Sequence, residues 1–181
     1  MQIDVISDTV CPWCYIGKRR LERAMKLRPQ IQFDVRWRPF QLDPATPAEG
    51  VERRAYIERK FGSTDKIKPI HNALLEAGRV EGLDFAFEKI ARTPNTINSH
   101  RLIRWSHSAG VQDAVVERLF HGYFMEGADI GDIECWRNLR LKPAWTPSWL
   151  RSYSTPMLTA KKSSTKTRWP ARSASTACRP I

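Results

Sequence analysis

The amino-acid sequence predicts an α/β protein in which a β-α-β unit precedes a block of helices. Residues 2–7 form a short run rich in β-branched side chains, and residues 31–38 alternate between apolar and polar side chains. Both patterns are typical of β-strands. The segment between them opens with Pro12, which suits the first position of a helix, and ends before Pro29. This order indicates two parallel strands joined by a right-handed crossover.

The predicted first helix, residues 12–28, has two different faces. We expect Leu21, Ala24 and Met25 to point toward the protein interior, with Cys14 beside them. The opposite side carries basic residues, which we interpret as a solvated helix face: Lys18, Arg19, Arg20, Arg23 and Lys26.

The strand at residues 31–38 has one face that is predicted to be buried, formed by Ile31, Phe33, Val35 and Trp37. After a proline-containing loop, four further segments have helical patterns: residues 49–61, 64–78, 97–109 and 112–125. Residues 83–87 alternate briefly and are expected to form an extended connector. Asn95 is predicted to be the N-cap of the helix that follows it.

The chain has 181 residues, enough for one domain with its own core. We divide it into the β-α-β unit (residues 1–43), the helical block (residues 44–134) and a basic tail (residues 135–181). The net charge is +11, but it is distributed unevenly. Residues 1–134 hold 20 Lys and Arg against 19 Asp and Glu, whereas residues 135–181 hold ten Lys and Arg and no acidic residue.

The composition of residues 135–181 is unusual for a folded segment. They include four Trp and five Pro, no Gly, and no helical or strand period. A GC-rich gene read out of frame tends to yield Arg, Pro, Ser, Ala and Trp. A shift of frame after Glu134 is compatible with an acidic, helix-like sequence that ends in Gly-Val-Pro. We therefore expect an out-of-frame, poorly ordered tail; the alternative is a genuine basic tail that binds nucleic acid or anionic surfaces.

Cys11 and Cys14 form a C-x-x-C motif between the first strand and the first helix, the context of a redox dithiol. A helix N-terminus favours an anion, so we expect Cys11 to have a lowered pKa and to act as the nucleophile. Cys14, one turn into the helix, is expected to be less exposed and to resolve a mixed disulfide on Cys11. Pro12 and Trp13 between them are predicted to limit access and to help set the reduction potential.

A zinc site is the structural alternative for these cysteines. Structural zinc normally takes four Cys or His ligands, often as two spaced pairs. The other two cysteines, Cys135 and Cys178, lie in the tail, and the four histidines are not paired at ligand spacing. We therefore predict no metal site.

Residues 1–134 resemble the DsbA family of thioredoxin-fold oxidoreductases, in particular its cytoplasmic FrnE-like branch. The matching stretches are D-x-V-C-P-W-C-Y-I-G (residues 8–17), W-R-P-F-Q-L-D-P (37–44) and P-N-T-I-N-S-H-R-L (94–102). The resemblance implies a thioredoxin-like fold with a helical insertion domain, and thiol–disulfide exchange with Cys11 as nucleophile. It also implies a cis-proline loop, a closing β-hairpin and a last helix, which the tail as written does not supply. We therefore expect the sheet to be incomplete.

The same superfamily includes 2-hydroxychromene-2-carboxylate isomerases and kappa-type glutathione transferases. The resemblance implies that those enzymes bind glutathione and use a Ser near the position of Cys11, where this chain departs from their pattern. A glutathione-dependent isomerase or transferase is the alternative function, and glutathione is a candidate co-substrate.

Two further residues are candidates for a substrate groove. Phe40 either lines a groove beside the dithiol or belongs to the core. His100 either contacts substrate or glutathione, or is a hydrogen-bonded helix residue that packs the two domains together. We favour the second interpretation of His100, because a lone His on a helix is usually structural.

The sequence thus predicts a dithiol–disulfide oxidoreductase that acts on protein or small-molecule thiols and disulfides and needs no cofactor beyond its own cysteines. We expect the out-of-frame tail to compromise this activity. The balanced charge of residues 1–134 makes nucleic acid an unexpected partner. The chain has no apolar run long enough to cross a bilayer and no signal-like start, so we expect a cytoplasmic protein without a membrane partner.

Overall fold

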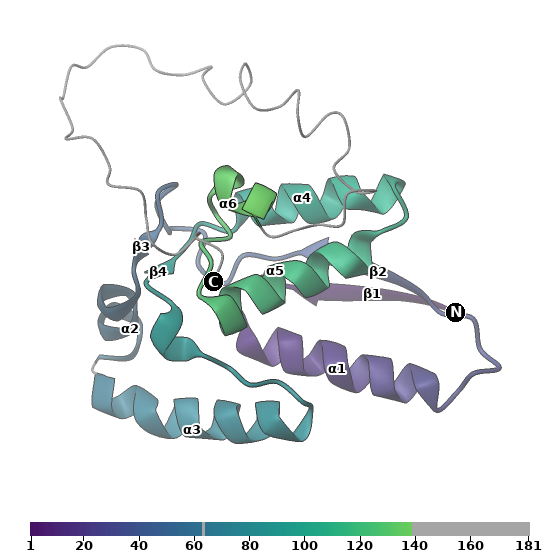
Figure 1. The fold of residues 1–181 in the computed structure, drawn as a ribbon, viewed down its shortest axis with the longest axis horizontal. Helices are drawn as coiled ribbons and strands as arrows, with labels where there is room; N and C mark the ends of the chain where they lie inside the picture. The colour runs from purple at the N-terminus through teal and green to yellow at the C-terminus, as the bar shows by residue number, and fades with distance from the viewer. Residues whose placement is uncertain (63, 139–181) are drawn as a thin grey trace, which may run out of the picture.

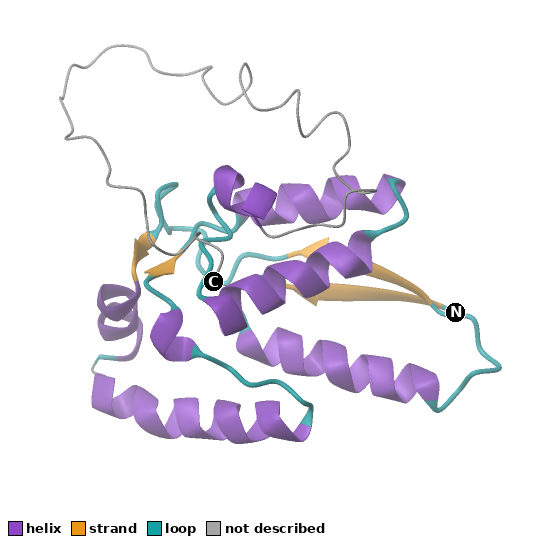
Figure 2. Ribbon diagram, viewed as in Figure 1, coloured by secondary structure: helices purple, strands orange, loops and turns teal. Residues whose placement is uncertain are grey.

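The computed structural model describes residues 1–62 and 64–138, which form helices around two small sheets (Figures 1 and 2). In chain order the elements are β1 (Gln2–Ser7), α1 (Pro12–Lys26), β2 (Asp34–Pro39), β3 (Val51–Glu52), α2 (Arg53–Phe61), α3 (Thr64–Val80), a 3-10 turn (Phe87–Lys89), β4 (Arg92–Thr93), α4 (Ile97–Ser108), α5 (Gln112–Glu126) and α6 (Ile133–Asn138). The predicted α/β class is confirmed.

The β-α-β unit is present, with β1 and β2 parallel as predicted. Gln2 lies opposite Asp34 and Ser7 lies opposite Pro39. The second strand begins three residues later than the alternating pattern suggests, because the chain is still turning at Ile31, whose N–H donates to the carbonyl of Arg28. Within the described part of the chain, this sheet has two strands.

The edge of β2 that faces away from β1 is bound by one side chain of α5. The backbone N–H of Trp37 donates to Gln112 Oε1 over 2.8 Å, and Gln112 Nε2 donates to the carbonyls of Trp37 and Ile103, over 3.2 Å and 3.1 Å. The Gln112 amide therefore takes the place of a neighbouring strand at this position. It also joins the sheet to α4 and α5.

The predicted helices are observed with most ends within two residues of those expected, and the largest difference is at the start of one helix. The helix expected over residues 49–61 begins only at Arg53, because Val51–Glu52 pairs with Arg92–Thr93 in an antiparallel sheet. The side chain of Glu52 then caps α2 by accepting from two backbone N–H groups. At α4, Thr96 is the N-cap, and Asn95 assists by accepting from the N–H of Ile97 over 3.0 Å.

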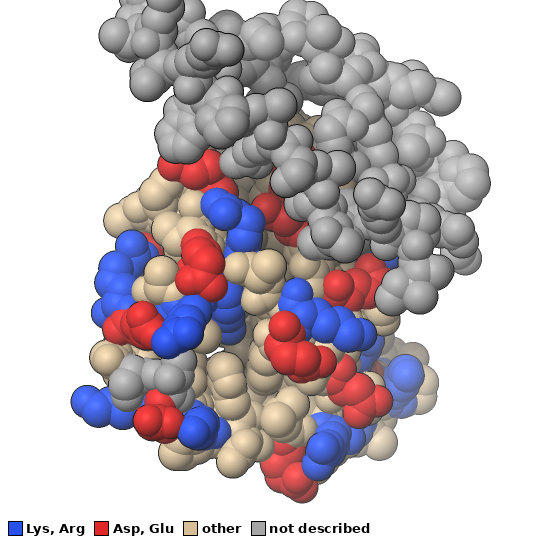
Figure 3. All heavy atoms as spheres, turned by 60° about the vertical axis from the view of Figure 1, so that its left-hand side comes forward, with Lys and Arg blue, Asp and Glu red and all other residues tan. Residues whose placement is uncertain are grey.

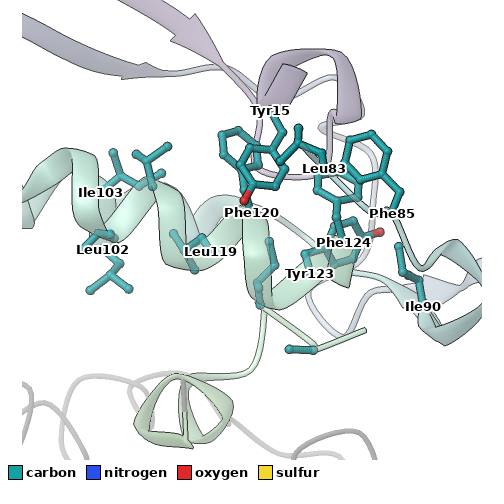
Figure 4. Close-up of a cluster of buried hydrophobic side chains, with 14 of the residues drawn as sticks. Tyr15, Leu83, Phe85, Ile90, Leu102, Ile103, Leu119, Phe120, Tyr123 and Phe124 are labelled. Carbon is teal, nitrogen blue, oxygen red and sulfur yellow. The ribbon is translucent and has the colours of Figure 1, made fainter. Parts of the chain in front are cut away.

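Aromatic side chains from α1, α5 and the segment before the 3-10 turn form the centre of the core (Figure 4). Tyr15 stacks on Phe120 with ring centroids 4.9 Å apart, and Phe85 meets Phe124 edge-on at 5.4 Å. Tyr15 directly follows Cys14 in the chain. The core therefore holds the first turn of α1, which carries the cysteine motif.

The prediction that the basic side of α1 is fully solvated is wrong at Lys18, which is only 3% exposed. Its ammonium contacts carboxylates of Glu22, Asp113 and Glu117. Burial alone would lower the pKa of Lys18, but these carboxylates hold that pKa above its ordinary value. The cause is tertiary, because two of the three carboxylates come from α5.

The described residues extend four positions into the predicted tail. Cys135 and Trp136 are buried within α6, and Trp136 Nε1 donates to the carbonyl of Ile130 over 2.8 Å. The rest of the predicted tail, from residue 139, lies outside the described residues.

The described surface carries both signs of charge. Figure 3 shows a face on which the described Lys and Arg side chains lie among Asp and Glu. None of the helices in the described ranges is both long enough and apolar enough to cross a membrane.

Candidate functional site

The two cysteines lie where β1 leads into α1. Cys11 is the N-cap residue of α1, and Pro12 is the first residue of the helix. The N–H of Cys11 donates to the carbonyl of Asp8 over 3.1 Å, which closes a turn between strand and helix. Both thiols are free and partly exposed. Trp13, between them, is 49% exposed and forms part of the surface next to the thiols.

A hydrogen bond between the two thiols shifts their pKa values in opposite directions. The pKa of Cys14 is lowered to about 6, chiefly by the hydrogen bond from Cys11 and also by hydrogen bonds from Ser7 and the backbone of Asp8, which together outweigh the effect of burial. The same thiol–thiol hydrogen bond, together with burial, raises the pKa of Cys11 above its ordinary value. The lowered pKa expected at Cys11 thus lies at Cys14, because Cys11 is the donor. A proton shift across this bond exchanges the two roles, so the first ionisation belongs to the pair.

Asp8 lies in the turn before Cys11 and is buried, with only 2% of the residue exposed. Its Oδ2 accepts from the N–H of Leu42 over 2.7 Å, and its Oδ1 lies 3.3 Å from His100 Nε2. His100 Nε2 is also 2.9 Å from the carbonyl of Phe40. A carbonyl only accepts, so Nε2 carries a hydrogen. His100 on α4 is therefore hydrogen-bonded to the turn before Cys11 and to the end of β2.

A second buried contact fixes the same turn to α4. Thr9 Oγ1 and Ser99 Oγ are 2.7 Å apart, and Ser99 Oγ also donates to the carbonyl of Thr96. The N-S-H-R segment at the start of α4 therefore positions the loop that leads into the cysteine motif.

Phe40 lies beside this turn and faces solvent, with 52% of the residue exposed. Its N–H donates to the carbonyl of Ser7 over 3.0 Å. With His100 it lines an open groove of about 420 Å³ between the end of β2 and α4. The structure therefore places Phe40 in a groove and not in the core.

Asp8, the buried residue that connects the dithiol to α4, was not among the candidates from the sequence. The available signal was the polar run Ser7-Asp8-Thr9 directly before the motif, which reads equally well as the end of a strand. In residues 1–62 and 64–138, no three His, Cys, Asp or Glu side chains are grouped so that they could hold a metal ion.

A thiol pair at the first turn of the helix after the first strand, with a second strand parallel to the first, is the arrangement of a thioredoxin-like domain. The chain matches the family model of the DSBA-like thioredoxin domain over residues 2–145. It belongs to this family, and the thioredoxin-like fold expected from the sequence is confirmed.

Two similar proteins extend the comparison. The chain is 26% identical over 134 residues to the uncharacterized protein YwbO of Bacillus subtilis. The matched residues make up 74% of this chain and 62% of YwbO. It also resembles the crystal structure of a probable DsbA oxidoreductase from Streptomyces coelicolor, with a TM-score of 0.74 and 25% identity. That match covers 84% of this chain and 66% of the other. The chain thus spans slightly less than two thirds of either protein.

Proposed function

We propose that this protein is a dithiol–disulfide oxidoreductase that acts through Cys11 and Cys14. The observation that carries the proposal is the pair of free, partly exposed thiols that hydrogen-bond to each other at the N-terminus of α1. One thiolate of the pair is stable near neutral pH, and a thiolate is the nucleophile in disulfide exchange. Membership of a DsbA-like family supports this reaction class.

The reaction has two exchange steps. The Cys11 thiolate attacks a substrate disulfide, so a Cys11–substrate disulfide forms and the first substrate sulfur leaves as a thiolate. The Cys14 thiolate then attacks Cys11 Sγ, which forms the Cys11–Cys14 disulfide and releases the second substrate thiolate. The substrate gains two electrons and the protein loses two; the reverse sequence oxidises a substrate dithiol.

The assignment of Cys11 as the first nucleophile rests on its position. Cys11 is the N-cap residue, and the backbone N–H groups of Trp13 and Cys14 interact with its sulfur and favour its anion. Cys14 is bound from behind by Ser7 and Asp8, on the strand side of the motif. We therefore assign the first attack to Cys11 and the resolving step to Cys14.

Two serine variants test the proposal. Cys11→Ser is expected to abolish the exchange of a model peptide disulfide, and Cys14→Ser is expected to accumulate a mixed disulfide on Cys11. Intact-mass spectrometry and turnover measure the two effects, and urea unfolding confirms that both variants fold. Equal residual activity in the two variants would contradict the assignment.

The proposal includes a class of substrate, disulfides, and a cellular compartment, the cytoplasm. Polypeptide disulfides and glutathione disulfide both fit the exchange chemistry, in a cytoplasmic setting. The resemblance implies a Ser near the position of Cys11 in the isomerases, so the cysteine in this chain favours thiol exchange over a glutathione-dependent isomerase or transferase reaction. Glutathione-dependent activity that survives Cys11→Ala would reverse this preference.

A further inference from the structure

The groove beside Phe40 combines apolar side chains with positive charge. Phe40 and Ile97 are 52% and 43% exposed, and both line it. Arg101 and Arg104 border the same groove from one side of α4, because residues three apart on a helix are neighbours. Among the described residues that line this groove, none is acidic.

The two arginines differ from those of α1. Arg19, Arg20 and Arg23 each contact a carboxylate. By contrast, Arg101 donates to the neutral amide oxygen of Asn98 over 3.3 Å. Within the described residues, neither Arg101 nor Arg104 forms an ion pair. A guanidinium that is next to an apolar surface and has no carboxylate partner is a natural binding group for an external carboxylate.

The groove is connected directly to the dithiol. The carbonyl of Ser7 binds the N–H of Phe40, and its hydroxyl hydrogen-bonds Cys14. Trp13 within the motif and Leu42 after Phe40 are also exposed apolar residues. Because Ser7 contacts both Phe40 and Cys14, a chain bound at the groove lies close to the thiols.

We propose that this groove binds an acidic segment of a polypeptide substrate, so that the dithiol prefers cysteines flanked by Asp or Glu. The inference rests on the proposed function and adds a substrate class to it. The groove, at about 420 Å³, is large enough for a few side chains. The exposed apolar side chains of Phe40 and Ile97 favour a polypeptide over a small hydrophilic thiol, and the charge of the arginines favours acidic residues.

A binding measurement tests the groove independently of any exchange activity. The probes are two fluorescent peptides in which Ser replaces the cysteine, one with Asp and one with Asn on both sides. Arg101→Glu/Arg104→Glu is expected to weaken binding of the Asp peptide about tenfold in fluorescence anisotropy at low salt. The matched control is Arg79→Glu, an exposed arginine on α3, which should leave the affinity within about twofold of the wild-type value.

An exchange measurement with the corresponding peptide disulfides gives the specificity. The wild-type protein is expected to react faster with the Asp-flanked disulfide, and the double arginine variant is expected to lose that ratio. Equal affinity for the Asp and Asn peptides, or a preference for glutathione disulfide over the Asp-flanked peptide, would overturn the proposal. Acidic-peptide binding without exchange by any disulfide would instead contradict the proposed function and leave the groove assignment supported.

Discussion

Cys14 receives hydrogen bonds from several directions, and this arrangement decides the chemistry of the dithiol. The thiol of Cys11, the hydroxyl of Ser7 and the backbone of Asp8 all stabilise its thiolate. The carboxylate of Asp8 acts in the opposite direction, because its negative charge raises the pKa of Cys14. These contacts lower the pKa of Cys14, so they favour a single thiolate in the reduced motif near neutral pH.

Thiolate absorbance should show this shared ionisation directly. In reduced protein titrated at 240 nm, we expect one thiolate of the motif to form with an apparent pKa of about 6, while its partner remains protonated well above the ordinary range. The Cys11→Ala/Cys14→Ala variant supplies the baseline from the remaining groups. Two independent ionisations near the ordinary cysteine pKa would contradict a shared proton.

The charge of Asp8 gives a second prediction at this scale. Asp8→Asn removes a negative charge next to Cys14 while keeping an oxygen that can accept from Leu42. The apparent pKa of the pair should therefore fall below the wild-type value in the same titration. If Asp8 has only a structural role, the apparent pKa of the cysteine pair will be unchanged in Asp8→Asn. A higher apparent pKa would mean that the loss of hydrogen bonds to Cys14 outweighs the loss of the negative charge.

Among the elements, α1 is fixed to the helical block directly after the cysteine motif. Tyr15 enters the aromatic core, and its hydroxyl donates to Glu117 over 2.7 Å. One turn later, Lys18 contacts carboxylates of α1 and α5. These contacts hold α1 against α5, so the position of the dithiol depends on the helical block as well as on the sheet.

Replacing Lys18 tests this contact between helices. Lys18→Met should lower the free energy of unfolding by about 1–3 kcal/mol at pH 7, because partly buried carboxylates lose their cation. The folded-state pKa of Glu22 is lowered, so this stabilisation is present above the ordinary Glu pKa and is lost as the pH falls through the lower folded value. The difference from wild type in urea unfolding should therefore shrink toward pH 3.

The control for this experiment is Lys26→Met, an exposed lysine in the last turn of α1. It should change the stability by less than about 0.5 kcal/mol. An equal effect of the two substitutions would mean that the buried contact at Lys18 contributes nothing specific.

Local sequence patterns predicted the main helices and strands correctly. They failed where contacts between residues far apart in the sequence determine the structure. Both strands of the β-α-β unit and the helices after Asn95 follow from periodicity and from proline and glycine positions. The pairing of Val51–Glu52 with Arg92–Thr93 has no such signal, because each strand is two residues long. Lys18 was placed on the wrong face because its partners Asp113 and Glu117 are about a hundred positions away. At the site, the C-x-x-C motif identified the dithiol, whereas the contact between Asp8 and His100 exists only in the folded chain.

At the scale of the whole molecule, the described residues form part of the domain seen in relatives. The chain spans 62% of YwbO and 66% of the Streptomyces coelicolor structure. The family match continues to residue 145, and α6 is packed on the core as far as Trp136. The expectation that residues 135–181 are read out of frame stays a prediction.

Sequencing the coding DNA across Ile133–Trp136 checks that prediction. If the tail is out of frame, a base will have been gained or lost there, and the restored frame will encode an acidic, helix-like segment. The excess positive charge of the chain would then disappear, because it is carried by residues 135–181. An intact frame would contradict the prediction and make the basic tail a genuine part of the protein.

The most direct measurement of the central claim is the oxidation state of one tryptic peptide. Residues 1–18 form a single tryptic peptide that contains Cys11 and Cys14 and no other cysteine. Reduced wild-type protein is mixed with a stoichiometric peptide disulfide, quenched with acid and alkylator, and analysed by mass spectrometry. The account predicts that this peptide loses two hydrogens and resists alkylation, in step with the appearance of free substrate thiol. Reduction of the substrate while both cysteines remain alkylatable would contradict it.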